Sequence, residues 1–383
     1  MNKTNQKVYI VSSLASSLIN FRLDLINKFI SYGYTVVCVA PNHDVDVVTK
    51  LNKMGVVFLH IPFNRNGISL LSDFSLVASL YAEFKREKPS VVLNYTIKPL
   101  IYGSIAARFA SVPNIISLVT GLGQAFSSAS SISDHLIKFL ARKLYALGLK
   151  SSTKVFFQNN DDRNKILDLK YIGLDKADIT NGSGVNLNTF PYSKVNVKNI
   201  SFLMVARLLK EKGVLDYIAA AKLIKAQYPD VVFNLVGPID GCKSIDISFI
   251  EENNNSGVIC YHGKQDNVLT YLQSCSIFVL PSYYPEGIPR SILEALSVGR
   301  GVITTNSVGC KETVVDGENG FLIPPKAPLV LADKMKSIID DPSLIEKFSK
   351  SSFELAKSRF DVVHVNNYIF EKSCIERKNE ENI

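Results

Sequence analysis

The feature that most constrains the fold is a repeated alternation of short β-branched runs with amphipathic segments. Residues 8–11 and 35–40 are apolar runs that predict strands, and between them apolar side chains recur at helical spacing from about Phe21 to Gly33. Further strands are predicted at 56–61, 91–93 and 115–119, with helices at 74–87 and 100–110. Such alternation predicts a parallel, doubly wound α/β sheet.

The alternation restarts after the short polar segment 191–199, which is expected to act as a hinge between two domains. Strands are predicted at 201–205, 231–236 and 277–280, with a helix at 215–226 and helices again within 343–376. We therefore expect two Rossmann-like domains facing a cleft, with ligand sites at the carboxyl ends of both sheets. The expected divisions are an N-terminal domain at 1–192, a C-terminal domain at 193–360, and a helix and tail at 361–383 that pack back on the N-terminal domain.

The positive charge is concentrated in the first half of the chain. A length of 383 residues with 46% hydrophobic residues allows two cores. Residues 1–192 carry 21 Lys and Arg against 12 Asp and Glu, or +9, while 193–383 carry 22 against 23, or −1. This asymmetry favours an anionic partner for the first half, and the alternative is charge that serves solubility alone.

Cysteine and histidine spacing predicts a reduced protein without zinc. The six cysteines show no Cys-x-x-Cys pattern and the five histidines no ligand pattern. The first seven residues are polar and the apolar run after them is too short for a signal peptide, so we expect a cytoplasmic chain. The uncharged stretch 109–133 contains proline, glycines and serines, which disfavour a membrane-spanning helix.

The strongest chemical signal is the segment Pro281-Ser282-Tyr283-Tyr284-Pro285-Glu286-Gly287-Ile288-Pro289-Arg290-Ser291-Ile292-Leu293-Glu294-Ala295. A buried strand leads into a loop and then into a helix whose first turn is expected to contain Pro289. Amides and the dipole at a helix start favour a diphosphate. Glu286 is suited to sugar hydroxyls and Glu294 to a ribose diol. The alternative is a capped helix with two solvent-facing glutamates.

A second signal places two cations after a strand of the same domain. Arg207 lies just beyond the strand at 201–205, and Lys212 lies at the start of the next helix. Fixed cations there would stabilise the negative charge on a departing diphosphate without a metal. The alternative is a pair of solvated basic residues. Asp44-Val45-Asp46 has the Asp-x-Asp pattern of metal-dependent transferases but lies in the other domain, so no metal is expected.

These motifs resemble the family 4 retaining glycosyltransferases, which have the GT-B fold of two Rossmann-like domains. Arg207 and Lys212 match the family's phosphate-binding Arg-x4-Lys, and the string from Glu286 to Glu294 matches its donor-binding loop. Tyr95-Thr96-Ile97-Lys98-Pro99 and Val119-Thr120-Gly121-Leu122-Gly123 are similar to bacterial members, among them N-acetylgalactosaminyltransferases, that build O-antigen, capsule or N-glycan precursors on undecaprenyl diphosphate. The resemblance runs from about Val8 to Phe360.

The resemblance implies a metal-independent transfer with retention at the anomeric carbon and no enzymic nucleophile. It assigns Glu286, Arg207 and Lys212 to the reacting donor. The implied nucleotide-sugar contacts are Gly287, Ile288, Pro289, Glu294 and Gly263, and the implied acceptor-side residues are Arg22, Lys98, Thr120 and Gly121. Two departures from the family stand out: residues 12–17 hold no glycine, and Thr120 stands where some relatives have a histidine or carboxylate.

The expected substrates are a nucleotide sugar, UDP-linked with N-acetylhexosamine as first choice, and a lipid-diphosphate-linked glycan. No cofactor is expected. A nucleotide-sugar 2-epimerase of the same architecture and a non-catalytic nucleotide-sugar-binding protein are the competing functions. No nucleic-acid partner is expected, because aromatic-basic platforms are lacking.

Residues 135–147 have helical periodicity and a mixed apolar and basic composition. Leu136, Phe139, Leu140, Lys143 and Leu147 fall on one side of the predicted helix, flanked by Lys138 and Arg142. Such a helix is suited to the anionic inner face of the cytoplasmic membrane, with Lys138, Arg142 and Lys143 as the docking cations. The alternative is a helix that packs into the core.

Overall fold

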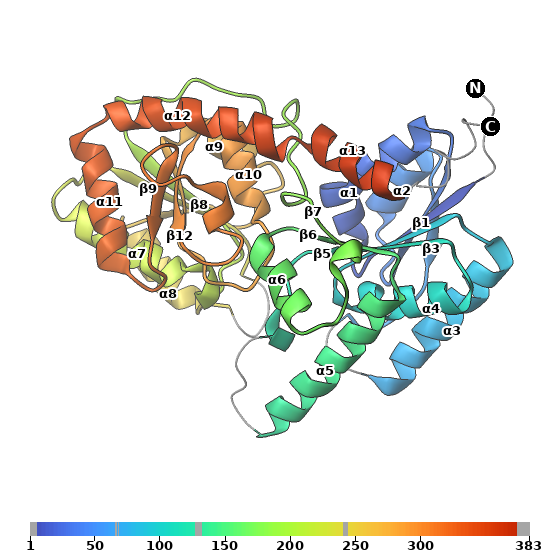
Figure 1. Ribbon diagram of the computed structural model, residues 1–383. Coiled ribbons are helices and arrows are strands. Elements are labelled where there is room, and N and C mark those ends of the chain that lie inside the picture. Colours follow the sequence, from blue (N-terminus) through green and yellow to red (C-terminus); the bar gives the residue numbers. More distant parts are fainter. Residues whose placement is uncertain (1–5, 66, 68, 127–131, 240–243, 374–383) are drawn as a thin grey trace. The chain divides into compact units, whose positions relative to one another are not determined.

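The computed structural model describes residues 6–373 apart from 66, 68, 127–131 and 240–243, and these residues form two compact units (Figure 1). The first unit comprises Met1–Ser183 together with Val363–Ile383, and the second comprises Gly184–Val362. The predicted division at 192 therefore lies inside the second unit. In the first unit the last helix packs on the first one, where the ring of Phe370 lies 5.2 Å from that of Phe29.

The division precedes residue 192 because the polar linker is bound to the second unit. The fully buried guanidinium of Arg300 donates to the backbone oxygen of Ser193 at 2.8 Å and to its hydroxyl at 2.7 Å. Ser297 donates its hydroxyl to the Phe190 carbonyl at 2.5 Å, and the Ser193 amide donates to Val298 at 3.2 Å. Sequence composition suggests a hinge here, whereas these hydrogen bonds hold the segment in place.

The first unit has a seven-stranded parallel sheet in the order β3-β2-β1-β4-β5-β6-β7. Its strands are β1 (Lys7–Val11), β2 (Thr35–Ala40), β3 (Val57–His60), β4 (Val91–Tyr95), β5 (Asn114–Val119), β6 (Lys154–Phe157) and β7 (Ala177–Ile179). Its helices are α1 (Ala15–Ser31), α2 (Val45–Lys53), α3 (Leu70–Glu87), α4 (Ser104–Phe109), α5 (Ile132–Ser151), α6 (Asn160–Asp168) and α13 (Val362–Ser373), with a π-helical turn at Pro99–Gly103.

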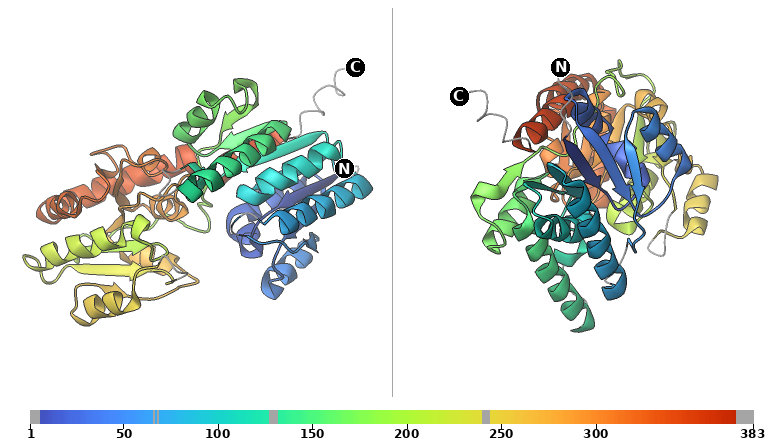
Figure 2. Two further views of the ribbon diagram at one scale, coloured as in Figure 1. Left: turned by 90° about the horizontal axis from the view of Figure 1, so that it is seen from below. Right: turned by 90° about the vertical axis from the view of Figure 1, so that its right-hand side faces the viewer.

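Both faces of this sheet are covered. In β1, Val8 and Ile10 join a core with α1, α2 and α13, whereas Tyr9 and Val11 join a core with α3, α4 and α5. Figures 1 and 2 show α3, α4 and α5 together on one face of the sheet. Because successive strand side chains point to opposite faces, burial on both sides explains the continuous apolar runs of the strands.

The second unit has a six-stranded parallel sheet in the order β10-β9-β8-β11-β12-β13. Its strands are β8 (Ser201–Val205), β9 (Val232–Val236), β10 (Cys260–Tyr261), β11 (Ile277–Leu280), β12 (Gly301–Thr305) and β13 (Gly320–Ile323). Its helices are α7 (Val214–Lys225), α8 (Ile247–Asn255), α9 (Leu269–Ser274), α10 (Arg290–Ser297), α11 (Pro328–Asp340) and α12 (Ser343–Leu355).

Several elements of the first unit differ from the sequence-based expectation, which did not include β6, α6 or β7, and α1 and α2 show the physical reasons. Helix α1 begins at Ala15, before the predicted start near Phe21. The free Ala15 amide at this start donates to the Asn42 Oδ1 at 2.9 Å, and the Ser17 hydroxyl lies 2.8 Å from the Tyr95 hydroxyl. A serine-rich stretch thus starts a helix. Helix α2 was not predicted, and Asp44 caps it by accepting a hydrogen bond from the Val47 amide.

Candidate active site

The order of strands reverses once in each sheet, between β1 and β4 and between β8 and β11. In doubly wound sheets, ligands bind at the carboxyl ends of the strands where this reversal occurs. In the second unit, Arg207 follows β8 and the segment 281–289 follows β11. Two of the motifs identified in the sequence therefore meet at the switch point of one sheet.

The turn that carries Lys212 is fixed to the segment after β11. The Tyr283 amide donates to the Glu211 carbonyl at 2.8 Å, and the Ser282 hydroxyl donates to the same oxygen at 3.3 Å. Gly213 has φ +79, and a Cβ there would lie 2.2 Å from the Pro281 carbonyl oxygen. Only glycine allows this approach, so the local sequence sets the position of Lys212.

Three predicted donor residues come together here around an aromatic ring that the prediction had not selected. Lys212 is buried and its ammonium forms an ion pair with the Glu286 carboxylate, whose side chain is 21% exposed. The Lys212 Nζ lies 5.1 Å from the Tyr284 ring centroid, and the Arg207 guanidinium carbon lies 5.7 Å from it. The site thus combines two cations, a carboxylate and an aromatic ring.

The loop from Glu286 to Pro289 is supported from the opposite side by the turn after β12. Gly309 has φ +80, and a Cβ there would lie 1.7 Å from the Gly287 carbonyl oxygen. Ile288 is buried, and Pro289 is the N-cap of α10 in an extended conformation (ψ 121). Helix α10 therefore begins at Arg290, which corrects the expectation that Pro289 lies in its first turn.

Glu294 is held on α10 by its neighbour one turn earlier. The Arg290 Nε donates to the Glu294 Oε1 at 3.1 Å, and the Glu294 side chain is 14% exposed. Burial raises the pKa of Glu294, and the charge and hydrogen bond of Arg290 oppose this rise. This arrangement contradicts the alternative in which Glu294 faces solvent.

Gly263 lies at the same carboxyl edge of the sheet, just beyond β10. Its carbonyl accepts a hydrogen bond from the Gly237 amide at 2.8 Å. Gly263 has φ +66 and open space where a Cβ would stand. Gly237, in turn, approaches so closely that a Cβ there would lie 1.8 Å from the Ala206 carbonyl oxygen. The loops after β8, β9 and β10 are therefore linked through two glycines.

The residues predicted for the acceptor lie in the first unit, and two of its cations point inward. Lys98 forms a buried ion pair with Asp73 at 2.6 Å, and the Tyr102 hydroxyl donates to the same carboxylate at 2.8 Å. Arg22 is 2% exposed and its guanidinium carbon lies 5.0 Å from the Tyr95 ring centroid. Neither side chain is an exposed cation, and the role of both residues on the acceptor side stays a prediction.

The carboxyl edge of the first sheet, at the switch point and at the neighbouring strand β5, carries small and hydroxyl-bearing residues. Thr120 and Gly121 follow β5, and Gly121 has φ +118. Thr96 follows β4 with φ +67, a left-handed conformation that is strained for a β-branched residue, and its hydroxyl donates to the Ser13 hydroxyl at 2.9 Å. The motif around Thr96 was visible in the sequence, but nothing in it signals the conformation.

The three docking cations predicted on α5 differ in their contacts and in their exposure to solvent. Lys138 pairs with Asp134 at 2.9 Å, and the Arg142 Nε donates to the Ala125 carbonyl at 2.8 Å. Lys143 is exposed. Of the three, Lys143 is thus the cation on the outer surface of the helix.

The apolar stripe of α5 lies on the same outer surface as Lys143. Exposed apolar side chains follow one another along the helix: Leu136 (70%), Ile137 (58%), Phe139 (57%), Leu140 (43%) and Leu147 (50%). Tyr145 and Leu149 face the core instead. One side of α5 therefore packs into the core, as in the alternative, while the apolar stripe on the other side is exposed.

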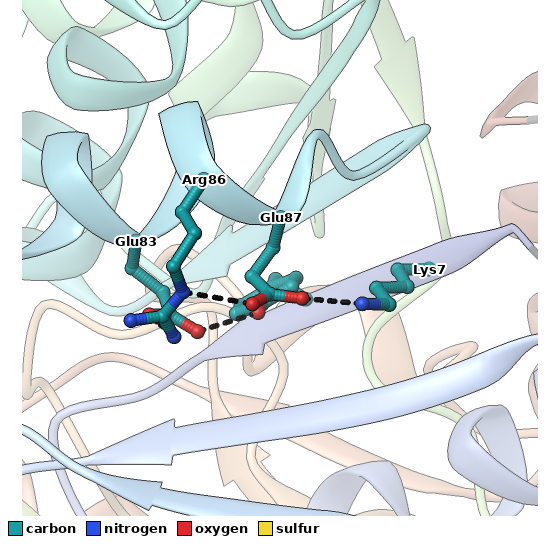
Figure 3. Close-up of polar contacts among 5 residues, drawn as sticks. Lys7, Glu83, Arg86 and Glu87 are labelled. Carbon is teal, nitrogen blue, oxygen red and sulfur yellow. Dashed lines mark hydrogen bonds and ion pairs between the residues drawn. The ribbon is translucent and has the colours of Figure 1, made fainter.

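An ion-pair network occupies the amino end of β1, opposite the switch point (Figure 3). Arg86 bonds Glu83 and, at 2.8 Å, Glu87, which also pairs with Lys7. The hydroxyl of Tyr9 donates to Glu83 at 2.7 Å. Ligands of such sheets bind at the other edge, so we assign this network to the stability of the first unit.

In the described part of the chain, no group of three His, Cys, Asp or Glu residues is arranged to hold a metal. Among the same residues, no helix is both long and apolar enough to cross a bilayer. Asp44, from the Asp-x-Asp pattern, caps α2. The described cysteines are free, with Cys38, Cys275 and Cys310 buried and Cys260 exposed, while Cys242 and Cys374 lie outside the described residues.

Solved structures with the same fold are glycosyltransferases and a related synthase. A glycosyltransferase from Rickettsia africae aligns with a TM-score of 0.78 and 18% identity over 98% of this chain and 100% of its own. The sucrose-phosphate synthase of Thermosynechococcus elongatus aligns with a TM-score of 0.78 and 17% identity over 98% and 99%. At these identities the likeness establishes the fold, which is GT-B, as predicted.

The family follows from sequence comparisons. Residues 188–354 match the model of the glycosyl transferases group 1, and residues 7–159 match that of the glycosyl transferase 4-like proteins. The UDP-Gal:alpha-D-GlcNAc-diphosphoundecaprenol alpha-1,3-galactosyltransferase of Escherichia coli is 30% identical over 69% of this chain and 70% of its own length. The chain therefore belongs to the group 1 glycosyltransferases, with a 4-like N-terminal domain.

Two further relatives span nearly the whole chain. The N,N'-diacetylbacillosaminyl-diphospho-undecaprenol alpha-1,3-N-acetylgalactosaminyltransferase of Campylobacter jejuni is 26% identical over 90% of this chain and 93% of its own. The capsular polysaccharide biosynthesis glycosyltransferase CapM of Staphylococcus aureus is 25% identical over 93% of each. These names confirm the prediction of a glycosyltransferase and do not support the epimerase alternative.

Proposed function

We propose that this enzyme transfers a sugar, with N-acetylhexosamine as first candidate, from a UDP-sugar to a lipid-diphosphate-linked glycan in bacterial surface polysaccharide synthesis. Support comes from the relatives, two of which are named for undecaprenol-linked acceptors and one for a UDP-sugar donor. The Campylobacter relative transfers N-acetylgalactosamine according to its name.

The arrangement of Arg207, Lys212 and Glu286 at the second switch point carries this proposal. When the donor bond breaks, negative charge develops on the leaving diphosphate, and fixed cations nearby lower the energy of that state. Lys212 and Arg207 supply the positive charge, and the start of α10 adds its dipole. Glu286 is held by Lys212 as a carboxylate acceptor, which suits hydrogen bonds to sugar hydroxyls.

On this proposal the transfer retains the anomeric configuration and needs no metal ion. The two cations take the place of a divalent metal at the diphosphate. The departing diphosphate itself lies on the face from which the acceptor hydroxyl attacks, so no side-chain nucleophile is required. The resemblance to retaining transferases supports this route. Retention is checked by the anomeric coupling constant of the isolated product.

The direct test is a transfer assay with a synthetic undecaprenyl-diphosphate-linked acceptor and a panel of UDP- and GDP-sugars, with and without EDTA. We expect transfer from one UDP-sugar that EDTA leaves unchanged. The variant Glu286→Gln should lose about 100-fold or more in kcat/KM, as is common when a polar contact to the reacting sugar and phosphate is removed. The exposed Glu251→Gln on α8 is the matched control.

Two outcomes would contradict the proposal. Conversion of the nucleotide sugar to an epimer without acceptor would make the chain an isomerase. Equal activity of wild type and Glu286→Gln would remove Glu286 from the mechanism while leaving the transferase assignment in place.

We further propose that the first unit docks on the anionic inner face of the cytoplasmic membrane through α5. The exposed stripe at Leu136, Phe139 and Leu140 supplies apolar side chains, and Lys143 lies beside Phe139 with its Nζ 5.3 Å from that ring. An apolar stripe with adjacent cations is the usual composition of a helix that lies in the membrane interface. The acceptor lipid would then be reached from the surface where it resides.

Sedimentation with vesicles containing anionic lipid tests this docking. Wild type should pellet with the vesicles at low salt, and the double variant Leu136→Ser/Leu140→Ser should stay in the supernatant. The variant Leu329→Ser is the matched control, because this exposed leucine belongs to α11 of the second unit. Equal sedimentation of all three proteins would exclude α5 as the docking element.

A further inference from the structure

Tyr284 contacts both cations of the candidate donor site. Its ring centroid lies 5.7 Å from the guanidinium carbon of Arg207 and 5.1 Å from the ammonium of Lys212. Cations within about 6 Å of an aromatic ring are attracted by its negative faces. Two like charges brought together before the substrate arrives repel each other, and the ring offsets part of that repulsion.

The backbone on both sides of Tyr284 is fixed. Its own amide donates to the Ser282 hydroxyl at 3.2 Å, and the Tyr283 amide donates to the Glu211 carbonyl at 2.8 Å. The Glu286 amide donates back to the Tyr284 carbonyl at 2.8 Å across Pro285, whose ring restricts the turn. The ring is thus held in place by the same segment that carries Glu286.

The two cations differ in what else restrains them. Lys212 is buried and also pairs with Glu286. Arg207 is exposed, and within the described residues it forms no salt bridge. A long side chain without such a restraint samples many rotamers, and ordering it on binding costs affinity. Within the described residues, the Tyr284 ring is therefore a contact that can limit the motion of the Arg207 side chain.

We propose that Tyr284 is a positioning residue that holds Arg207, and secondarily Lys212, in the orientation that receives the donor diphosphate. The inference rests on the proposed donor site. The physical effect is preorganisation. The ring reduces the conformational entropy that Arg207 loses on binding, and it holds both cations close together before the diphosphate arrives. The ring itself takes no part in the chemistry.

The test compares binding of UDP with binding of uridine, because the difference between them isolates the diphosphate. Tyr284→Phe keeps the ring and should bind UDP within about twofold of wild type. Tyr284→Leu keeps apolar bulk without the ring and should bind UDP roughly five- to tenfold more weakly. Uridine affinity should change in neither variant. Isothermal titration, with displacement for the weak uridine complex, gives the dissociation constants.

A double-mutant cycle with Arg207→Gln shows whether the ring acts through the cation. In that background Tyr284→Leu should cost no more than about twofold in UDP affinity. Should Tyr284→Leu fail to fold, judged by thermal unfolding, 3,4,5-trifluorophenylalanine at position 284 replaces it, since it keeps the shape and weakens only the attraction of the ring for cations.

Several results would overturn the inference. These are an unchanged UDP affinity in the leucine or trifluorinated variant, an equal loss for UDP and uridine, or the same loss in the presence and absence of Arg207. A wild-type chain that prefers neither UDP nor another nucleoside diphosphate to the free nucleoside would instead overturn the donor site itself, together with the role of Tyr284.

Discussion

The strand order reverses at equivalent places in the sheets of the two units, yet the cations near the two switch points have different surroundings. In the second unit, Arg207 and Lys212 surround the Tyr284 ring at the carboxyl edge. In the first unit, Lys98 is buried against Asp73, and the edge carries Thr96 and hydroxyl-bearing neighbours instead. One switch point thus carries the two cations that we propose bind the donor diphosphate, whereas at the other the cation forms an ion pair with a carboxylate of α3.

This difference changes the meaning of the charge asymmetry in the sequence. Residues 1–192 hold the whole excess of +9, but the first switch point does not display it. Lys98 and Arg22 are buried, and Arg86 and Lys7 belong to the network at the amino edge. Arg207 and Lys212, which we propose bind the donor diphosphate, belong instead to the half of the chain with a net charge of −1. On this proposal, the net charge of a chain segment indicates the place of an anionic partner less well than the ends of individual strands do.

The largest effect is expected when the buried cation of the first unit is removed. Lys98→Met leaves the Asp73 carboxylate buried without its counterion, because the side chains are only 7% and 5% exposed. Breaking a buried pair in this way costs about 3–5 kcal/mol of unfolding free energy. Urea denaturation measures it. The double variant Asp73→Asn/Lys98→Met should recover most of the loss. A single variant as stable as wild type would mean that Lys98 is free to serve a ligand.

Removing Lys212, the buried cation at the switch point of the second unit, should instead affect catalysis. Lys212→Met deprives the leaving diphosphate of a fixed charge, and kcat/KM should fall about 100- to 1000-fold. Stability should change less than for Lys98→Met, because the Glu286 carboxylate left behind is 21% exposed and reaches water. Lys336→Gln, on the surface of α11, controls for the lost charge. If Lys212→Met lowered stability as much as Lys98→Met and spared activity, the contrast between the units would be lost.

A buried carboxyl should make the stability of the first unit depend on pH. Burial raises the pKa of Asp162 from its usual value of 3.8 to about 6, against the opposing effects of the Asn159 hydrogen bond and the Lys165 charge. The folded chain then holds this proton more tightly than the unfolded chain does. The contribution of Asp162 to stability is therefore complete below pH 4 and falls by about 2–3 kcal/mol as the pH rises to 6 and above.

The variant Asp162→Asn isolates this effect from other groups that titrate in the same range. Its unfolding free energy, measured from pH 4 to pH 7, should lack the decline that wild type shows. The Asn159 Nδ2 donates to the Asp162 carboxylate at 3.0 Å, and the Asn159 Oδ1 accepts from the Asp162 backbone amide at 2.8 Å. An asparagine at 162 can keep both hydrogen bonds, so the cap of α6 remains. Parallel pH profiles of both proteins would show that the pKa of Asp162 is ordinary.

The fold and the meeting of the donor residues could be predicted because both follow from local patterns. Alternating strands and helices imply parallel strands, and parallel strands place Arg207 and Glu286 at one edge whatever the side chains between them. The ring of Tyr284 was within the same motif, but its contact with both cations depends on the Gly213 turn against Pro281. That approach is a tertiary feature.

The sequence could not reveal contacts between residues that lie far apart along the chain. Lys98 pairs with a carboxylate on α3, 25 residues away. Arg300 binds Ser193 from 107 residues away and so moves the boundary between the units. In both cases the residue or segment is fixed by a contact that has no local signal in the sequence.

The smallest expected effect is on membrane binding through the cations of α5. It distinguishes an exposed lysine, Lys143, from a lysine that is paired with a carboxylate, Lys138. A lysine near an anionic bilayer contributes about 1 kcal/mol to binding, so Lys143→Gln should weaken binding to anionic vesicles about fivefold. Lys138→Gln should change it less, because Lys138 is 14% exposed in its side chain and pairs with Asp134 on the same helix. Vesicle sedimentation across a salt series measures both variants. Equal losses would show that the Lys138 pair opens at the membrane, and a larger loss for Lys138 than for Lys143 would reverse the assignment of the docking surface.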